Sequence, residues 1–89
     1  MIKLQFVHVP GCHVCVLVMN IIKEIQPQFP DLEIEQVDAT TEKGQELLQK
    51  YRIMSSPGLI INGELFSMGM IKKEDLVKKL QDIQNENKQ

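Results

Sequence analysis

Two cysteines, Cys12 and Cys15, are separated by two residues and are the only cysteines in this chain of 89 residues. Residues three apart on a helix are neighbours, with Cβ atoms roughly 5–6 Å apart, whereas a disulfide requires about 3.5–4.5 Å. A small adjustment in the first turn of a helix therefore closes or opens the bond with little strain. This spacing favours a reversible dithiol over a permanent crosslink.

The two sulfurs are expected to differ in reactivity because they occupy different positions. Cys12 lies between an apolar segment and a helical one, so it is placed at a helix N-terminus, where unpaired N–H groups and the helix dipole stabilise a thiolate. A protonated His13 would add to this effect, which makes His13 a candidate tuning residue. Cysteines in such positions have pKa values lowered to about 3.5–7.5. We therefore predict that Cys12 is the attacking nucleophile and that Cys15, one turn further and more buried, is the resolving thiol.

Two other interpretations of these residues remain open. Both cysteines can be ordinary buried thiols, because a Cys-x-x-Cys spacing by itself is weak evidence for redox chemistry. The same Cys-x-x-Cys can also bind a metal or an iron–sulfur cluster, since His8 and His13 flank the cysteines and structural zinc sites take four such ligands. His8 ends an apolar segment and His13 points outward from the first turn, so the four side chains are not expected to converge. We assign no metal ligand, and His8 is more typical of a strand end than of a catalytic base.

The segments around the cysteines have the periodicities of a strand and a helix. Residues 2–9 are apolar at both parities, which is typical of a central strand covered on both faces. Pro10 and Gly11 end this strand. The next apolar residues lie at helical spacing: Val18, Ile21, Ile22 and Ile25. Pro27 is expected to end this helix near Gln26.

The rest of the chain continues the alternation of strands and helices. A short strand is predicted over residues 32–37, and Thr40-Thr41 offers a cap for a second helix. Asn62-Gly63 between two strand-like runs is a strong hairpin signal. A final amphipathic helix is marked by Leu76, Val77, Leu80 and Ile83. The order β-α-β-α-β-β-α, with right-handed crossovers, predicts an α/β fold with a four-stranded mixed sheet and three helices.

Length and composition limit the class of protein. The length predicts one domain, over residues 1–84, followed by a polar C-terminal tail over residues 85–89. A net charge of −2 and a pI near 5.6 disfavour nucleic acid as a partner, because that partner needs a basic surface. No apolar run approaches the ~20 residues of a membrane span, and the first residues do not resemble a signal peptide. Two cysteines are too few to crosslink a small secreted scaffold, so we expect a cytoplasmic protein. We also expect it to be a monomer.

Three features together resemble the thioredoxin/glutaredoxin superfamily, in particular its small members in bacteria and archaea. They are the strand–Cys-x-x-Cys–helix opening, the Ser-Ser-Pro at residues 55–57 and the Asn-Gly turn, and the resemblance covers residues 2–83. It implies a thioredoxin-like fold and a thiol–disulfide oxidoreductase that forms a mixed disulfide on Cys12. It also implies that Pro57 is cis and packs against the dithiol, and that the backbone of Ser56 pairs with an extended substrate segment. No bound cofactor is expected, because the dithiol carries two electrons itself.

The chain departs from the family pattern at positions that bear on its mechanism and partners. Phe6 stands where typical thioredoxins carry a buried Asp, so the proton acceptor for Cys15 is unassigned. Glutaredoxins usually carry Gly-Gly and a nearby Asp after the last strand to bind glutathione, whereas residues 68–71 are Met-Gly-Met-Ile. This difference disfavours glutathione and favours a protein disulfide as substrate, with a flavoprotein of the thioredoxin reductase type as reductant. Met68 and Met70 are either an adaptable apolar rim for a partner or a core and a loop residue.

Overall fold

The computed structural model describes residues 2–87 and shows the predicted order of strands and helices. The elements are β1 (Ile2–His8), α1 (His13–Ile25), a short 3-10 helix η1 (Gln26–Gln28), β2 (Leu32–Asp38), α2 (Glu42–Lys50), β3 (Gly58–Ile61), β4 (Glu64–Met68) and α3 (Lys73–Asn87). The predicted domain boundary at residue 84 stays a prediction, and α3 continues through residues 85–87. The last two residues of the predicted tail lie outside the described part of the chain.

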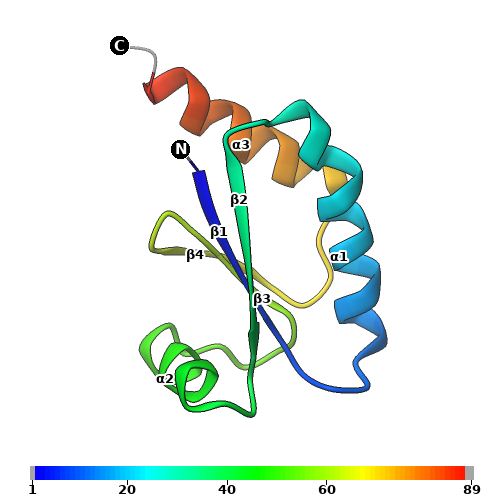
Figure 1. Cartoon of the computed structure of the whole chain (residues 1–89), viewed down its shortest axis with the longest axis vertical. Coiled ribbons are helices and arrows are strands. Elements are labelled where there is room, and N and C mark those ends of the chain that lie inside the picture. The colour runs from blue at the N-terminus through cyan, green and yellow to red at the C-terminus, as the bar shows by residue number, and fades with distance from the viewer. Residues whose placement is uncertain (1, 88–89) are drawn as a thin grey trace.

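The four strands form one mixed sheet in the order β2-β1-β3-β4. β1 is parallel to β2 and antiparallel to β3, and β3 is antiparallel to β4. Helices α1 and α3 lie on one face of the sheet and α2 on the other (Figure 1). Within residues 2–87, no helix is long and apolar enough to cross a membrane.

β1 is buried on both faces, as its apolar residues of both parities predicted. Leu4 and Phe6 pack in the larger core cluster with residues of α1 and α3, whereas Val7 packs in the smaller cluster beside α2. Burying one apolar side chain of this size contributes roughly 1.5–3 kcal/mol, so both core layers hold β1 in place. The loop over residues 9–12, which we call the Cys12 loop, directly follows this strand. The strand therefore gives the two cysteines a rigid support.

The turn that joins β3 and β4 has the backbone that its sequence predicted. Asn62 and Gly63 both have positive φ, at 50° and 81°, as the two central residues of a type I′ hairpin require. The side chain of Asn62 also accepts a hydrogen bond from the backbone N–H of Lys3, at 2.8 Å. The hairpin is therefore joined to the beginning of β1 as well as closed on itself.

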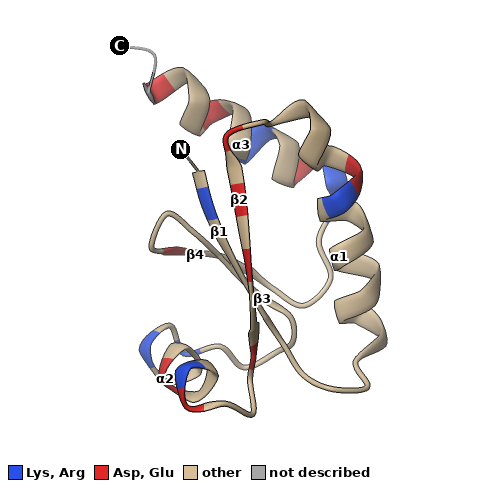
Figure 2. Ribbon diagram, in the orientation of Figure 1, with Lys and Arg blue, Asp and Glu red and all other residues tan. Residues whose placement is uncertain are grey.

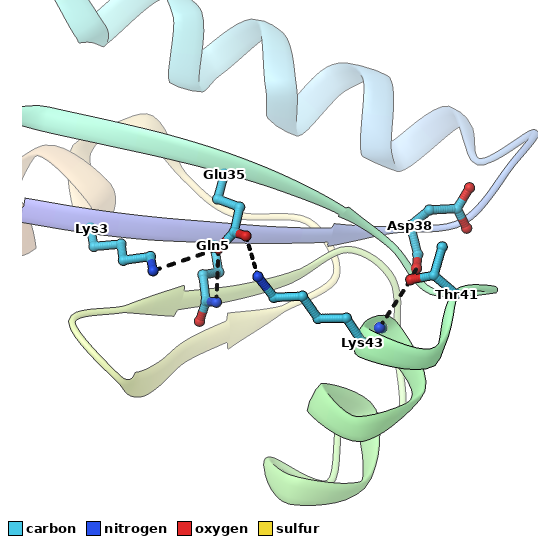
Figure 3. Close-up of polar contacts among 7 residues, drawn as sticks. Lys3, Gln5, Glu35, Asp38, Thr41 and Lys43 are labelled. Atoms are coloured by element: carbon cyan, nitrogen blue, oxygen red, sulfur yellow. Dashed lines mark hydrogen bonds and ion pairs between the residues drawn. The ribbon is translucent and has the colours of Figure 1, made fainter.

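A capping contact begins α2 directly after β2 ends. Thr41, one of the two predicted caps, is the N-cap residue, and its hydroxyl accepts a hydrogen bond from the backbone N–H of Gly44 at 3.1 Å. The same hydroxyl donates to the carbonyl oxygen of Asp38 at 2.6 Å. Such a cap is typically worth about 1 kcal/mol. It sets the sharp change of direction between β2 and α2 (Figure 3).

Charged side chains join β1, β2 and α2 across the edge of the sheet (Figure 3). Glu35 accepts a hydrogen bond from the side-chain amide of Gln5 at 3.0 Å and pairs with the ammonium group of Lys43. The ammonium group of Lys3 lies 3.8 Å from the same carboxylate. The hydrogen bond from Lys43, followed by that from Gln5, lowers the pKa of Glu35. None of these four side chains is among the residues that surround the two cysteines.

Candidate active site

Cys12 is the N-cap residue of α1, the position that the sequence predicted for the nucleophile. Its backbone is extended, with φ −85° and ψ 113°, and α1 begins at His13. The backbone N–H of Cys15 donates a hydrogen bond to the Sγ of Cys12 at 3.1 Å. An N–H group directed at sulfur, together with the positive end of the helix dipole, favours negative charge on that sulfur.

Cys12 and Cys15 form a disulfide, with their Cα atoms 5.2 Å apart. Cys15 is buried, with 5% of its surface exposed, and packs in the larger core cluster. Cys12 is half-buried. The predicted difference in exposure between the two sulfurs is therefore confirmed, and the interpretation as two unrelated buried thiols is wrong.

A cleft of about 430 Å³ opens beside the disulfide. It is lined by the end of β1, the loop at residues 9–12, the beginning of α1 and one residue of β2, and both cysteines contribute to its wall. The two histidines of the chain, His8 and His13, line it as well. Figure 2 shows α1 near its beginning, and the loop before it, without Lys, Arg, Asp or Glu. The residues that line the cleft therefore include no Lys, Arg, Asp or Glu.

Gln36 is a lining residue that the sequence did not single out. It comes from β2, where it pairs with Phe6 of β1. The sequence of β2 alone could not predict that Gln36 lines the cleft, because that position depends on the register between two strands.

Pro57 and Ser56 lie at the end of the sheet from which the Cys12 loop extends. Gly58, the first residue of β3, pairs with Val7, so Pro57 directly precedes β3 near the last residues of β1. The Ser56–Pro57 peptide bond is cis, as the resemblance implied. Pro57 is fully buried and Ser56 half-buried. The contact of Pro57 with the dithiol and the pairing of Ser56 with substrate stay predictions.

Three exposed methionines surround this proline loop. Met54, Met68 and Met70 are 89%, 41% and 58% exposed, and the backbone N–H of Met54 donates to the Sδ of Met68 at 3.2 Å. The interpretation of Met68 as a core residue is wrong, because its position at the end of the edge strand β4 leaves it facing solvent. The sequence analysis did not single out Met54, which is the most exposed of the three.

The histidines do not join the cysteines as metal ligands. Across residues 2–87, no group of three or more His, Cys, Asp or Glu side chains is arranged to hold a metal ion. The ring of His8 instead stacks on that of Phe6, with centroids 5.8 Å apart, and His13 is exposed. The four-ligand interpretation therefore lacks its ligand set.

Comparisons with known proteins point to one family. Residues 2–82 match the family model described as thioredoxin domain. The chain is 30% identical over 77 residues to a thioredoxin of Methanocaldococcus jannaschii, covering 85% of this chain and 88% of that protein. It is 24% identical over 74 residues to a probable thioredoxin of Methanothermobacter thermautotrophicus, covering 82% and 85%.

Solved structures share the fold at lower sequence identity. An uncharacterised thioredoxin-like protein from Clostridium perfringens superimposes with a TM-score of 0.80 at 15% identity, covering 92% of this chain and 70% of that one. Thioredoxin-2 of the malaria parasite superimposes with a TM-score of 0.74 at 16% identity, covering 92% and 82%.

Proposed function

Because this chain belongs to the thioredoxin domain family and is a thiol–disulfide oxidoreductase, we propose that it reduces disulfides of protein substrates with Cys12 as nucleophile and Cys15 as resolving thiol. The observation that carries these roles is the position of Cys12 as the cap of α1, with an N–H group directed at its sulfur. The burial of Cys15 supports the second role, because a buried thiol meets only a substrate already bound to its neighbour.

The reaction proceeds by two exchanges of sulfur–sulfur bonds. The thiolate of Cys12 attacks one sulfur of the substrate disulfide, and the other substrate sulfur leaves as a thiolate. The thiolate of Cys15 then attacks the Sγ of Cys12, which releases the second substrate sulfur and leaves the Cys12–Cys15 disulfide. The substrate gains two electrons and the enzyme loses two, so a separate reductant must regenerate the dithiol.

The helix terminus favours the first exchange. The first turn of α1 carries no acidic residue, so no negative side chain opposes a thiolate on Cys12. His13 directly follows Cys12, is exposed and lines the cleft. In its protonated form it adds positive charge beside the sulfur, which is the tuning role we assign to it.

We assign substrate binding to Ser56 and Pro57. Both residues precede β3 at the end of the sheet where Cys12 lies, and an extended peptide can pair with backbone at such a place. The exposed Met54, Met68 and Met70 beside them offer flexible apolar contacts that suit varied protein partners. We further propose that the protein acts as a monomer in the cytoplasm, where a dithiol is kept reduced.

Reduction of the Cys12–Cys15 disulfide is expected to be faster with a flavoprotein of the thioredoxin reductase type than with glutathione. Glutathione carries two carboxylates, and no Lys or Arg lines the cleft to bind them. Beyond β4, Met70 is exposed and Ile71 buried, and neither offers a polar side chain to that tripeptide. The initial rates of NADPH oxidation measure the difference, with the flavoprotein oxidising NADPH directly and glutathione coupled to glutathione reductase. Comparable rates with both reductants would contradict the proposed reductant.

A redox titration is expected to show one transition of two electrons. The protein is equilibrated in dithiothreitol buffers of defined poise, and free thiols are alkylated and counted by mass. Cys12→Ser and Cys15→Ser should each leave one thiol that is alkylated at every poise, because neither variant can close the internal bond. Two independent thiols in the unaltered protein would refute the dithiol couple.

A further inference from the structure

The cleft beside the disulfide contains few groups that can accept a proton. Of its lining residues, only His8, Cys12, His13 and Cys15 have side chains that titrate, and none is an Asp, Glu, Lys or Arg. The second exchange needs such a group. Cys15 is 5% exposed, and burial disfavours the thiolate form of a thiol, yet it must lose its proton before it attacks Cys12.

His8 lines the same cleft as Cys15. It ends β1, is half-buried, and stacks on Phe6 along the wall of the cleft that Cys15 also lines. His13 is exposed and directly follows Cys12, so it lies on the outer side of the site. Histidine is also the side chain whose ordinary pKa lies between pH 5 and 8, which suits a group that accepts and returns a proton.

The charged and titratable neighbours of His8 are limited. Asp38 of β2 lies opposite His8 in the register of the two strands. On the side of α1, the titratable residues that line the cleft are Cys12, His13 and Cys15. Gly58 of β3, opposite Val7, brings no charge. Hydrogen bonds from the hydroxyl and the backbone N–H of Thr40 lower the pKa of Asp38, and the charge of His8 lowers it further. Asp38 therefore stays a carboxylate at neutral pH beside the imidazole.

We propose that His8 is the proton acceptor for Cys15, through water held in the cleft. The inference rests on the proposed roles of Cys12 and Cys15. A volume of about 430 Å³ accommodates several waters, each taking about 30 Å³ in the liquid. The Cys15 thiol gives its proton to His8, and the Cys15 thiolate attacks the Sγ of Cys12. The substrate sulfur leaves as a thiolate and takes the proton back from the imidazolium.

The test follows both exchanges with one reagent, dithiobis(nitrobenzoate), whose thiolate is coloured. Mixing the reduced protein with one equivalent releases a first coloured thiolate when Cys12 attacks and a second when Cys15 attacks. In His8→Gln, the second phase is expected to be slower by about 10²-fold at pH 7, the lower range for a positioned proton acceptor. The difference from the unaltered protein should shrink as the pH rises, because Cys15 then ionises increasingly without an acceptor. The first phase should not change.

His13→Gln is the matched variant, because it removes the other imidazole of the cleft. It is expected to alter the first phase and to keep the pH dependence of the second. If His8→Gln leaves the second phase unchanged, or slows it equally at every pH, the assignment of His8 is overturned. His8→Asn repeats the measurement if His8→Gln does not form the Cys12–Cys15 disulfide.

The proposed roles of the cysteines can fail separately in the same experiment. A second phase that persists in Cys15→Ser would show that Cys15 is not the resolving thiol, whatever His8→Gln does. A second phase that requires Cys15 and is indifferent to His8 leaves the proposed function intact and removes only the proton acceptor.

Discussion

Cys12→Ser is expected to abolish the reduction of a protein disulfide. A serine hydroxyl at the cap of α1 is not ionised near neutral pH and forms no bond that a thiol can exchange, so the first step has no nucleophile. Loss of the attacking group in such a mechanism lowers turnover by several orders of magnitude. The measurement is the rate at which substrate thiols appear, followed by alkylation and mass. Turnover at the rate of the unaltered protein would contradict the role of Cys12.

Cys15→Ser is the matched variant, because it keeps Cys12 and removes only the second sulfur. Its expected product is a mixed disulfide between Cys12 and the substrate, which accumulates because nothing in the protein displaces it. Intact mass without reductant detects this adduct, and dithiothreitol releases it. If Cys12→Ser traps the substrate and Cys15→Ser does not, the two roles are reversed.

Gly44→Ala is expected to destabilise the protein strongly. In an ordinary helix this change would stabilise by up to about 1 kcal/mol, but here a Cβ would overlap the carbonyl oxygen of Asp38 and lie 2.6 Å from the Cα of Ala39. Both obstacles are backbone atoms, which cannot move aside as a side chain can. We expect a loss of roughly 3 kcal/mol, the upper part of the usual cost of overpacking.

Thermal unfolding measures this loss. For a domain of this size, roughly 3 kcal/mol corresponds to a fall in Tm on the order of 15 °C. Glu46→Ala, at an exposed position of the same helix, is the control and should change stability by less than about 0.5 kcal/mol. A Gly44→Ala protein that is as stable as this control would show that α2 can shift away from β2 at little cost.

The proposed role of His8 would replace the buried acid of typical thioredoxins. Phe6 occupies that position and packs in the core, and the ring of His8 stacks on it. Residues two positions apart on a strand point to the same face of a sheet. His8 is therefore on the same face as Phe6, and it lines the cleft. In this proposal the group that accepts the proton of Cys15 lies two residues further along the same strand than the acid of typical thioredoxins.

Much of the fold follows from local patterns in the sequence. The strand before Cys12, the helix after it, the cap at Thr41 and the Asn62-Gly63 hairpin all lie where they were predicted. Each depends on residues within a few positions of one another, through side-chain periodicity, a capping hydroxyl or the positive φ of a turn. The position of Cys12 at a helix terminus, and the burial of Cys15 one turn later, follow from the same local rules.

The tertiary structure decided what depends on contacts between distant segments. The register of β1 with β2 places Asp38 beside His8 and Gln36 in the wall of the cleft, and no pattern within either strand carries that register. The edge position of β4 leaves Met68 exposed, against the interpretation of this residue as core. Side-chain alternation predicts which residues of one strand share a face. Which residues of other elements lie next to them depends on the pairing of the strands and on the packing of α1 against the sheet. The dithiol could therefore be predicted from the sequence, whereas the cleft that surrounds it could not.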